Sequence, residues 1–404
     1  MHTTRLLPAS APLPLLLPLL LLAPTASPAL AQGPASADSA AGRPALLRAA
    51  EGAVSLAERV LEALTVERPS WSLALYPAAS YSGRSGLALG VMPMLHVSSP
   101  RLPRPATVTP AVLVSTRGMF EVQCDADVYL PRRVDLTAKV EAYRQPDDLY
   151  APGGGSGKRP LARYDFSRQS AQVEALKGLG PDGPWRVGLG LDFDRYSFSS
   201  VAPASEAEAE AAARLASSGS GPNFGLGAVG GYDSRDDALW PSAGAYVRLK
   251  AMGYAKIGGR GHDFCSLSLD ARRYAGLGGG RSVLALQVCA EARLGRAPYT
   301  KMATFGGTRL GRAVGHNLKY VDRGAWLAQA ELRLPLFWRL GATLFGGAGN
   351  VAHKWRDAAR GVHLMCGGGL RLAVFKGKKL NMRLDGGISN RGDRAVYLNI
   401  REAF

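Results

Sequence analysis

The sequence contains few cysteines, and they are not spaced as metal ligands usually are. Only four occur among the 404 residues, with no CxxC pair. We therefore expect no metal site and no cofactor. Cys265 and Cys289 flank a glycine-rich turn, but Cys265 shares a strand face with leucines and Cys289 one with Gln287 and Glu291. A disulfide between them is therefore disfavoured, and all four cysteines, Cys124 and Cys366 included, are interpreted as small fillers.

Acidic residues are scarce beside basic ones. Lys and Arg number 49 and Asp and Glu 32, a formal net charge of +17. In a soluble protein such an excess suggests a nucleic-acid partner. Here the basic residues are spread along the chain rather than gathered in one tract, so no nucleic-acid partner is expected. In an exported barrel they would face the lumen, or anionic lipopolysaccharide and phospholipid headgroups.

Long apolar runs are absent beyond the N-terminus, which excludes an internal spanning helix. Residues 1–5 are basic, 13–23 are apolar but broken by prolines, and 28–32 offer an Ala-x-Ala cleavage site. We predict a signal peptide over 1–31. The alternative, an N-terminal membrane anchor, needs roughly 20 apolar residues, more than this run supplies. No cysteine lies near the cleavage site, which disfavours lipoprotein processing.

Two segments, 44–65 and 204–215, show helical character. Residues 44–65 carry an apolar stripe with helical spacing, and the preceding residues 32–43 are rich in Ala, Ser, Gly and Pro and form a linker. We predict a linker and amphipathic periplasmic helix over 32–70, too short for a separate folded domain. The Ala-Glu repeat at 204–215 predicts a short external helix or a solvated spacer.

From Trp71 onward a two-residue period predicts strands. The 49 glycines and 14 tyrosines suit strands that are apolar on one face only. A soluble sandwich would alternate in the same way, but the charges at many alternate positions favour a wet lumen. We expect an all-β fold, a transmembrane antiparallel barrel of about 16 strands over 71–404. The predicted strands span 72–82, 87–97, 107–117, 119–130, 134–145, 163–177, 185–199, 224–235, 244–255, 263–275, 282–294, 325–335, 340–349, 361–375, 380–389 and 394–404.

Short turns follow even-numbered strands, and the long connections follow odd-numbered ones, the arrangement of outer-membrane barrels. The even strand number predicts that both termini are periplasmic in a Gram-negative outer membrane. The last strand, 394–404, places Val396, Leu398, Ile400 and Phe404 on one face. Ending on an aromatic residue, it predicts the closing strand and the signal read by the outer-membrane assembly machinery. It would pair with 72–82, with Glu402 at the rim.

The loop at 296–324 holds FGGTRLGRAVGHNLKYVDR and is followed by AQAELRLPL and LFGGAGNV. These segments resemble the bacterial surface antigen superfamily, which shows GG…LRGY, ELR-P-L and F-G-D-x-G-x-V there. The first hairpin, YPAASYSGRSGLALGVMPML, is also similar. The family comprises sixteen-stranded barrels, including the BamA/TamA insertases and the transporters of two-partner secretion. The resemblance covers residues 71–404.

The resemblance implies that this loop folds into the lumen, where its arginine pairs with acids on strands twelve and thirteen. Gly306 and Gly307 match the double glycine of the motif, and Glu331 and Arg333 match the acid and base of the strand. Because the order is Leu-Gly-Arg, either Arg309 or Arg312 is the pairing arginine. Gly347 replaces the family's aspartate, so Glu331 is the best candidate acid. The alternative is that these residues are merely solvated lumen charges.

The resemblance implies a role in inserting or translocating proteins at the outer membrane, with no client indicated. Residues 32–70 cannot supply the substrate-capturing domains of the insertases, so the chain is similar to barrel-only members. One alternative is a passive porin-like channel. Another is an outer-membrane hydrolase, for which His316 near Asp322 is the only tempting pair. We do not expect an enzyme.

Overall fold

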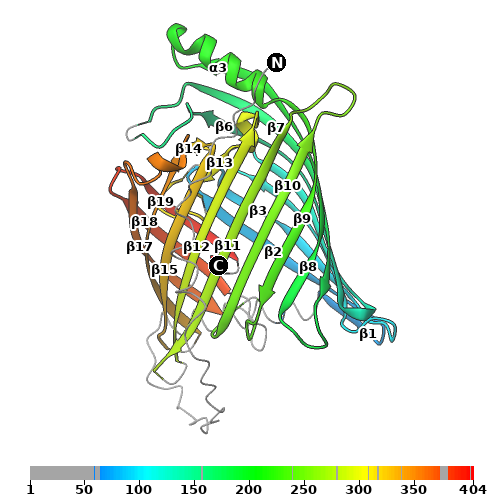
Figure 1. Cartoon of the computed structure of the whole chain (residues 1–404). Coiled ribbons are helices and arrows are strands. Elements are labelled where there is room, and N and C mark those ends of the chain that lie inside the picture. The colour runs from blue at the N-terminus through cyan, green and yellow to red at the C-terminus, as the bar shows by residue number, and fades with distance from the viewer. Residues whose placement is uncertain are drawn as a thin grey trace. The chain divides into compact units, whose positions relative to one another are not determined.

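Alternating apolar and polar residues form sixteen long strands that close into one antiparallel barrel in the computed structural model (Figure 1). The structure describes residues 59, 64–155, 158–238, 240–278, 281–307, 309–315, 318–337, 339–373, 381–400 and 402–404. The predicted signal peptide, all but residues 59, 64 and 65 of the predicted helix, and His316 lie outside the described residues.

The barrel strands are β2 to β12 and β15 to β19, and each pairs with its neighbour in chain order. Their bounds are β2 Trp71–Ser82, β3 Gly86–Val97, β4 Ala106–Ser115, β5 Phe120–Leu130, β6 Val134–Leu149, β7 Ala162–Gly178, β8 Trp185–Pro203, β9 Gly221–Asp233, β10 Gly244–Ala255, β11 Phe264–Leu277, β12 Ser282–Gly295, β15 Gly324–Pro335, β16 Leu340–Ala352, β17 His363–Ala373, β18 Asn381–Ser389 and β19 Arg394–Ile400. The predicted strand number is confirmed. The sequence pattern also located each strand, although β6 and β8 continue to Leu149 and Pro203, beyond their predicted ends.

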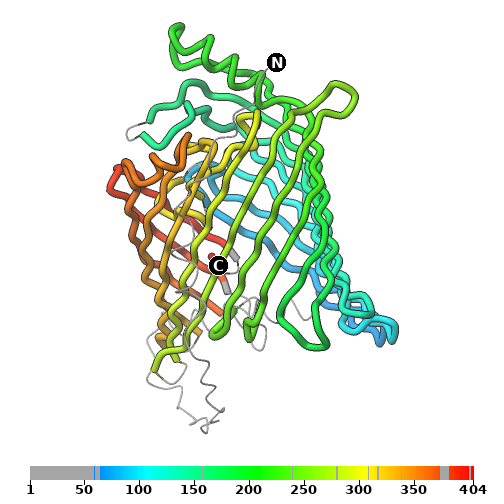
Figure 2. Tube along the Cα trace, viewed as in Figure 1, coloured from blue at the N-terminus to red at the C-terminus, as the bar shows by residue number. Residues whose placement is uncertain are grey.

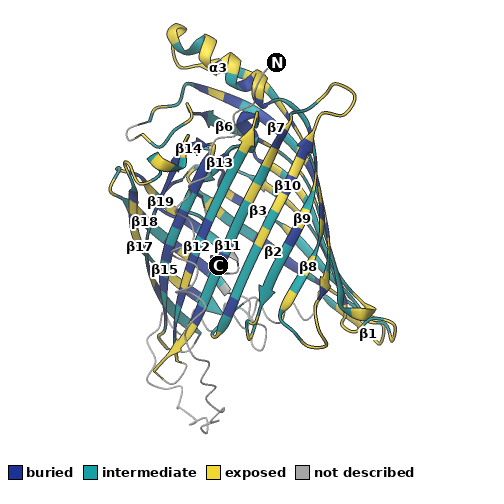
Figure 3. Ribbon diagram, viewed as in Figure 1, coloured by how far each residue is buried: buried dark blue, intermediate teal, exposed yellow. Residues whose placement is uncertain are grey.

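The barrel is apolar outside and charged inside. On β8, Leu189 and Leu191 are 62% and 56% exposed, whereas Asp192 and Asp194 are 8% and 0% exposed. Figure 3 shows exposed residues along the outer faces of the strands. Proteins that are stable in water rarely expose continuous rows of leucines. The outer surface is therefore suited to contact lipid, and the inner surface is suited to line a polar lumen.

The longest connections gather at one end of the barrel. They include α3 (Glu206–Gly219) and the loop that contains β13 (Ala303–Phe305) and β14 (Tyr320–Asp322) (Figure 1). The 3-10 turns η2 (Pro131–Arg133), η3 (Tyr299–Lys301) and η4 (Trp355–Asp357) complete the described elements. The Ala-Glu repeat is therefore helical, with Ala212 and Ala216 buried. No described helix is both long and apolar enough to cross a bilayer.

The prediction for residues 65–68 is wrong, because they form strand β1 (Thr65–Arg68) rather than part of a linker and helix. β1 pairs with β2 from Thr65–Ala74 to Arg68–Trp71. Pro69 follows directly, and a residue that precedes proline is pushed out of the helical region toward extended backbone. Because Trp71–Ala74 also pair with β3, β1 lies along the opposite edge of β2, the edge that β19 meets at Tyr81.

The prediction for the last strand is partly wrong. β19 ends at Ile400, and the chain then turns inward, so Phe404 is 4% exposed and packs against Tyr274, Val283 and Ala285 of the inner wall. Val396 faces outward at 49% exposure, Leu398 is half-buried, and the side chain of Ile400 lies outside the described part. Glu402 is likewise inside the lumen and not at the rim, since its carboxylate pairs with Arg371.

We expect Phe404→Ala to lower barrel stability by about 3–5 kcal/mol, because it empties a packed apolar site within the lumen. Val396→Ala, on the outer face, is the control and should have a much smaller effect. The measurement is the denaturant midpoint of the folded band on a semi-native gel. Equal midpoints for the two variants would show that Phe404 is not packed inside.

Candidate functional site

The loop between β12 and β15 enters the barrel and fills part of the lumen. Its residues Ala303, Phe305, Ala313, Val314 and Tyr320 are at most 1% exposed and form one apolar cluster with wall residues that include Leu327, Val351 and Met365. The antiparallel pairing of β13 with β14 holds the two ends of the loop together. The loop therefore packs as a plug rather than extending outward.

Glycines shape the plug at its tip. Gly307 and Gly311 have φ angles of 94° and 92°, a region that residues with a side chain rarely adopt. The amide of Gly306 donates to the carbonyl of Leu310 at 2.6 Å, and that of Gly307 donates to the carbonyl of Val314 at 3.0 Å. The double glycine of the motif thus makes a tight turn, and Arg312, which follows Gly311, is directed toward the wall.

Arg312 is fully buried and pairs with two carboxylates. Its Nη1 lies 2.6 Å from Glu331 on β15 and 3.3 Å from Asp385 on β18. Its guanidinium also lies 3.7 Å from the centre of the Phe345 ring, an attractive cation–π arrangement. Of the two arginines that the sequence left open, the structure pairs Arg312 with Glu331.

Further charges extend this contact into what we term the lumen ion cluster. Arg333 contacts Glu331 at 2.8 Å, Arg383 contacts Asp385 at 2.6 Å, and Arg371 bridges Asp385 at 2.6 Å and Glu402 at 2.9 Å. Four guanidinium groups thus face three carboxylates, all nearly free of water. The members of the lumen ion cluster are Arg312, Arg333, Arg371, Arg383, Glu331, Asp385 and Glu402.

The acid that complements Glu331 lies on β18, the fifteenth barrel strand, and not on the twelfth or thirteenth strand as the resemblance implied. Asp385 alternates with the outward-facing Leu384, which is 45% exposed, so the strand pattern could have placed it in the lumen. Gly347 could not carry that acid. A Cβ there would lie 2.7 Å from the Ala328 carbonyl oxygen and 2.8 Å from the Gln329 Cβ, closer than real contacts allow.

Two other predicted residues bind the folded-in end of the chain. The Nε of Arg309 donates to the carbonyl of Ala403 at 3.1 Å, and the described contacts give Arg309 no ion pair with Glu331. The Nη2 of Arg333 donates to the main-chain oxygen of Phe404 at 2.6 Å. The plug, the wall and residues 402–404 are therefore held by one continuous network.

A second loop, the connection between β6 and β7, lies against the plug. The amide of Gly153 donates to the carbonyl of Val321 at 2.7 Å, and Lys158 donates to the carbonyl of Lys319 at 3.3 Å. Burial lowers the pKa of Lys158 to about 8, because its ammonium group has lost water and lies near Lys319.

With this geometry in view, comparison with known proteins identifies the fold. No family model and no curated protein matches the sequence. Among solved structures, BamA from Haemophilus ducreyi lacking POTRA domains 1–3 superposes with a TM-score of 0.56 at 13% identity, covering 87% of this chain and 78% of that one. CdiB from Escherichia coli gives 0.54 at 13% identity, and CdiB from Acinetobacter baumannii gives 0.52 at 11%.

The protein has the fold of these barrels. It covers 63% and 59% of the two CdiB chains, with 83% and 81% of its own length aligned. The likeness expected from the loop and strand motifs is thus found in the fold, although the identities are too low to carry function.

We expect Arg312→Ala to destabilise the barrel by about 3–5 kcal/mol, because it leaves Glu331 and Asp385 buried near an emptied site. Arg309→Ala removes one hydrogen bond to the main chain and should cost about 1 kcal/mol. Denaturant midpoints of the two variants provide the measurement. If Arg309→Ala proved the more damaging, the pairing of Arg312 would not hold the plug.

Docking of the second loop should strengthen as pH rises from about 8 to about 10.5. The folded pKa of Lys158 lies below its usual value, so in that range the undocked loop binds more protons and deprotonation favours docking. Hydrogen exchange at Gly153, corrected for base catalysis, should slow relative to Lys158→Met. The same pH dependence in that variant would exclude Lys158 as its source.

Proposed function

We propose that this chain is an integral outer-membrane barrel of the surface-antigen superfamily that inserts or translocates proteins, with both termini in the periplasm. Its proposed surroundings are outer-membrane lipid and lipopolysaccharide, and the assembly machinery would insert it. The proposal rests on the fold, the loop motif and, above all, the junction between the first and last strands.

That junction is the weakest in the barrel wall. β19 has 7 residues and β2 has 12, and among the described residues they meet at a single register position, Leu398 opposite Tyr81. By contrast, β18 pairs with β19 from Met382–Ile400 to Ile388–Arg394. Figure 2 shows the first and last strands side by side at this junction.

A weakly paired edge has a specific chemical consequence in lipid. Main-chain N–H and C=O groups without partners cost several kcal/mol each in the bilayer core. A strand of another protein can satisfy them by adding to the edge. β1 already occupies this edge of β2 at Trp71–Ala74, so the rest of the junction is the part suited to receive a client strand, while the plug closes the lumen against passive flow.

The alternative is a passive channel, and the plug argues against it. The apolar cluster of the loop and the buried pair of Arg312 and Glu331 occupy lumen space that a porin leaves to water. A hydrolase has no supporting geometry in the described residues.

A photo-crosslinking amino acid at Tyr81 should capture exported or outer-membrane proteins in growing cells, because the side chain lies at the proposed entry edge. The same probe at Leu189, an outward-facing and even more exposed position on β8, is the control and should nevertheless capture much less. Mass spectrometry identifies the captured proteins.

Two results would contradict the proposal. One is an equal yield of crosslinks at both positions. The other is a large, steady conductance of the purified barrel in planar bilayers that Glu331→Ala leaves unchanged, since this would indicate an open pore.

A further inference from the structure

The outer face of the barrel carries a groove close to the end where the long connections gather. It has a volume of about 450 Å³ and lies over β7, β8, β9 and β10, which are neighbours in the wall (Figure 1). A volume of roughly 300–1,000 Å³ is typical of ligand sites. Asp192 borders the groove, but its carboxylate lies on the lumen side, 2.9 Å from Lys301. The outward side chains are apolar and include Leu191, Phe193, Phe224, Leu226 and Ile257.

Two small residues of β10 leave this groove open. Gly253 lies opposite Leu226 and Ala255 lies opposite Phe224, so each large side chain of β9 has a small neighbour. The nearest neighbour of a Cβ added at Gly253 would be the carbonyl oxygen of Leu226, at 3.8 Å, and the φ angle of Gly253 is not positive. Neither packing nor backbone conformation therefore requires glycine here, and a larger side chain would fill the groove without disturbing the wall.

Two arginines border the groove on its side toward the loops. Arg195 occupies the next outward position of β8 after Phe193 and lies opposite Pro222 of β9. In the turn after β10, Arg260 lies opposite Ile257, to which it is joined by main-chain hydrogen bonds of 2.9 and 3.1 Å. Residues that lie directly opposite each other in an antiparallel pair share one face, so the side chain of Arg260 is on the outer face with that of Ile257.

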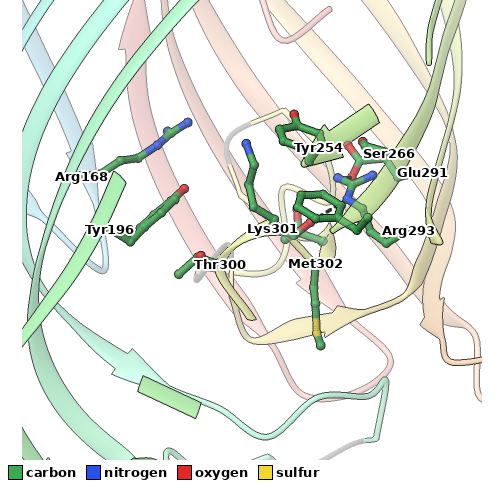
Figure 4. Close-up of a pocket in the computed structure, with 11 residues that line it drawn as sticks. Arg168, Tyr196, Tyr254, Ser266, Glu291, Arg293, Thr300, Lys301 and Met302 are labelled. Carbon is green, nitrogen blue, oxygen red and sulfur yellow. Dashed lines mark hydrogen bonds and ion pairs between the residues drawn. The ribbon is translucent and has the colours of Figure 1, made fainter. Parts of the chain in front are cut away.

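Both of these arginines are exposed, and neither has a carboxylate partner among the described residues. Cations on the inner face of the same strands differ in this respect. Figure 4 shows Arg168 and Lys301 around a polar recess inside the barrel, where they pair with Glu141 at 3.2 Å and with Asp192 at 2.9 Å. The wall thus supplies acids to its buried cations and leaves the two outer ones available to a ligand.

Nearby acids on the outer side do not cancel this charge. Asp165 lies 3.9 Å from Arg144, and Asp263 lies 3.9 Å from Lys256, so each of these acids already has a cation beside it. The two arginines at the groove therefore add two positive charges that the described part of the outer rim does not balance.

An apolar groove with positive charge at one end matches an amphiphile in which an acyl chain adjoins a phosphate. A guanidinium group is well suited to phosphate, because its N–H donors can bind two phosphate oxygens at once. In the orientation of the proposed function, the long connections face the cell exterior. The groove then lies in the outer leaflet, where the phosphorylated amphiphile is lipopolysaccharide.

From these observations we propose that the groove is a binding site for lipopolysaccharide. One acyl chain of its lipid A part lies over Gly253 beside Phe224 and Leu226, and Arg195 and Arg260 bind the phosphates. The site is about halfway round the wall from the junction of β2 and β19, so a bound lipid would hold the side of the barrel opposite that junction. The inference rests on the orientation in the proposed function and not on the insertion of proteins.

The test is native mass spectrometry of the purified full chain in detergent micelles. Lipid A, phosphatidylglycerol and phosphatidylethanolamine are added separately at equal concentrations. Lipid A should be retained as a single copy and at least several-fold more strongly than either phospholipid, because it offers a phosphate to each of the two arginines.

The double variant Arg195→Gln, Arg260→Gln should weaken lipid A binding by about tenfold or more, since it removes two charge-assisted contacts. The matched control is the double variant Arg356→Gln, Arg360→Gln, which removes the same charge from the connection between β16 and β17. These two side chains are 76% and 83% exposed, and their loss should leave binding unchanged.

Gly253→Phe should weaken lipid A binding several-fold, because the new ring would occupy the groove. Its control is Gly230→Phe on β9. Gly230 lies opposite the outward-facing Leu249, and a Cβ added there would meet no described atom within 4 Å. The gel mobility of the folded band verifies that each variant is folded.

Four results would overturn the proposal. Retention of phosphatidylglycerol as strong as that of lipid A would exclude lipopolysaccharide as the specific ligand. Equal weakening by the two arginine pairs would indicate general charge attraction, and unchanged binding in Gly253→Phe would leave the groove without a role. A dimer of the chain that Gly253→Phe dissociates would make the groove an interface between copies. None of these results alters the crosslinks expected at Tyr81, so failure of the lipid site can be distinguished from failure of the proposed function.

Discussion

A guanidinium group removed from water must find carboxylates, and in this barrel that requirement organises the whole lumen. Arg312 reaches Glu331 and Asp385 from the plug, and those acids are in turn shared with arginines of β15, β17 and β18. Removing one member of such a network leaves the remaining buried charges without their full set of partners, which is energetically costly. The plug is therefore bound through the wall as a whole and not through a single contact.

The barrel itself could be predicted from the sequence because lipid on one side and water on the other impose a strict two-residue period. β5 shows this period over its full length, and its boundaries could be predicted to within one residue. The ends of the strands were less predictable, since β6 and β8 continue above the wall where both faces meet protein or water. There the alternation no longer carries information.

The site could be predicted only in part. Glu331 and the choice between Arg309 and Arg312 came from a motif, but Asp385 lies 73 residues from Arg312 in the sequence, and only barrel closure brings the two together. The inward turn after Ile400 also had no local signal. Alternation assigned Phe404 to the outer face, whereas packing against Tyr274 and hydrogen bonding to Arg333 place it inside. Contacts that depend on closure are invisible to periodicity.

The inward turn of residues 402–404 has a consequence for the stability of the plug. Glu402 neutralises Arg371, and the main chain of Ala403 and Phe404 satisfies Arg309 and Arg333. Without these last residues the lumen ion cluster would hold four guanidinium groups against two carboxylates, and the plug would lose its contact through Arg309. The docked plug and the folded-in end of the chain therefore stabilise each other.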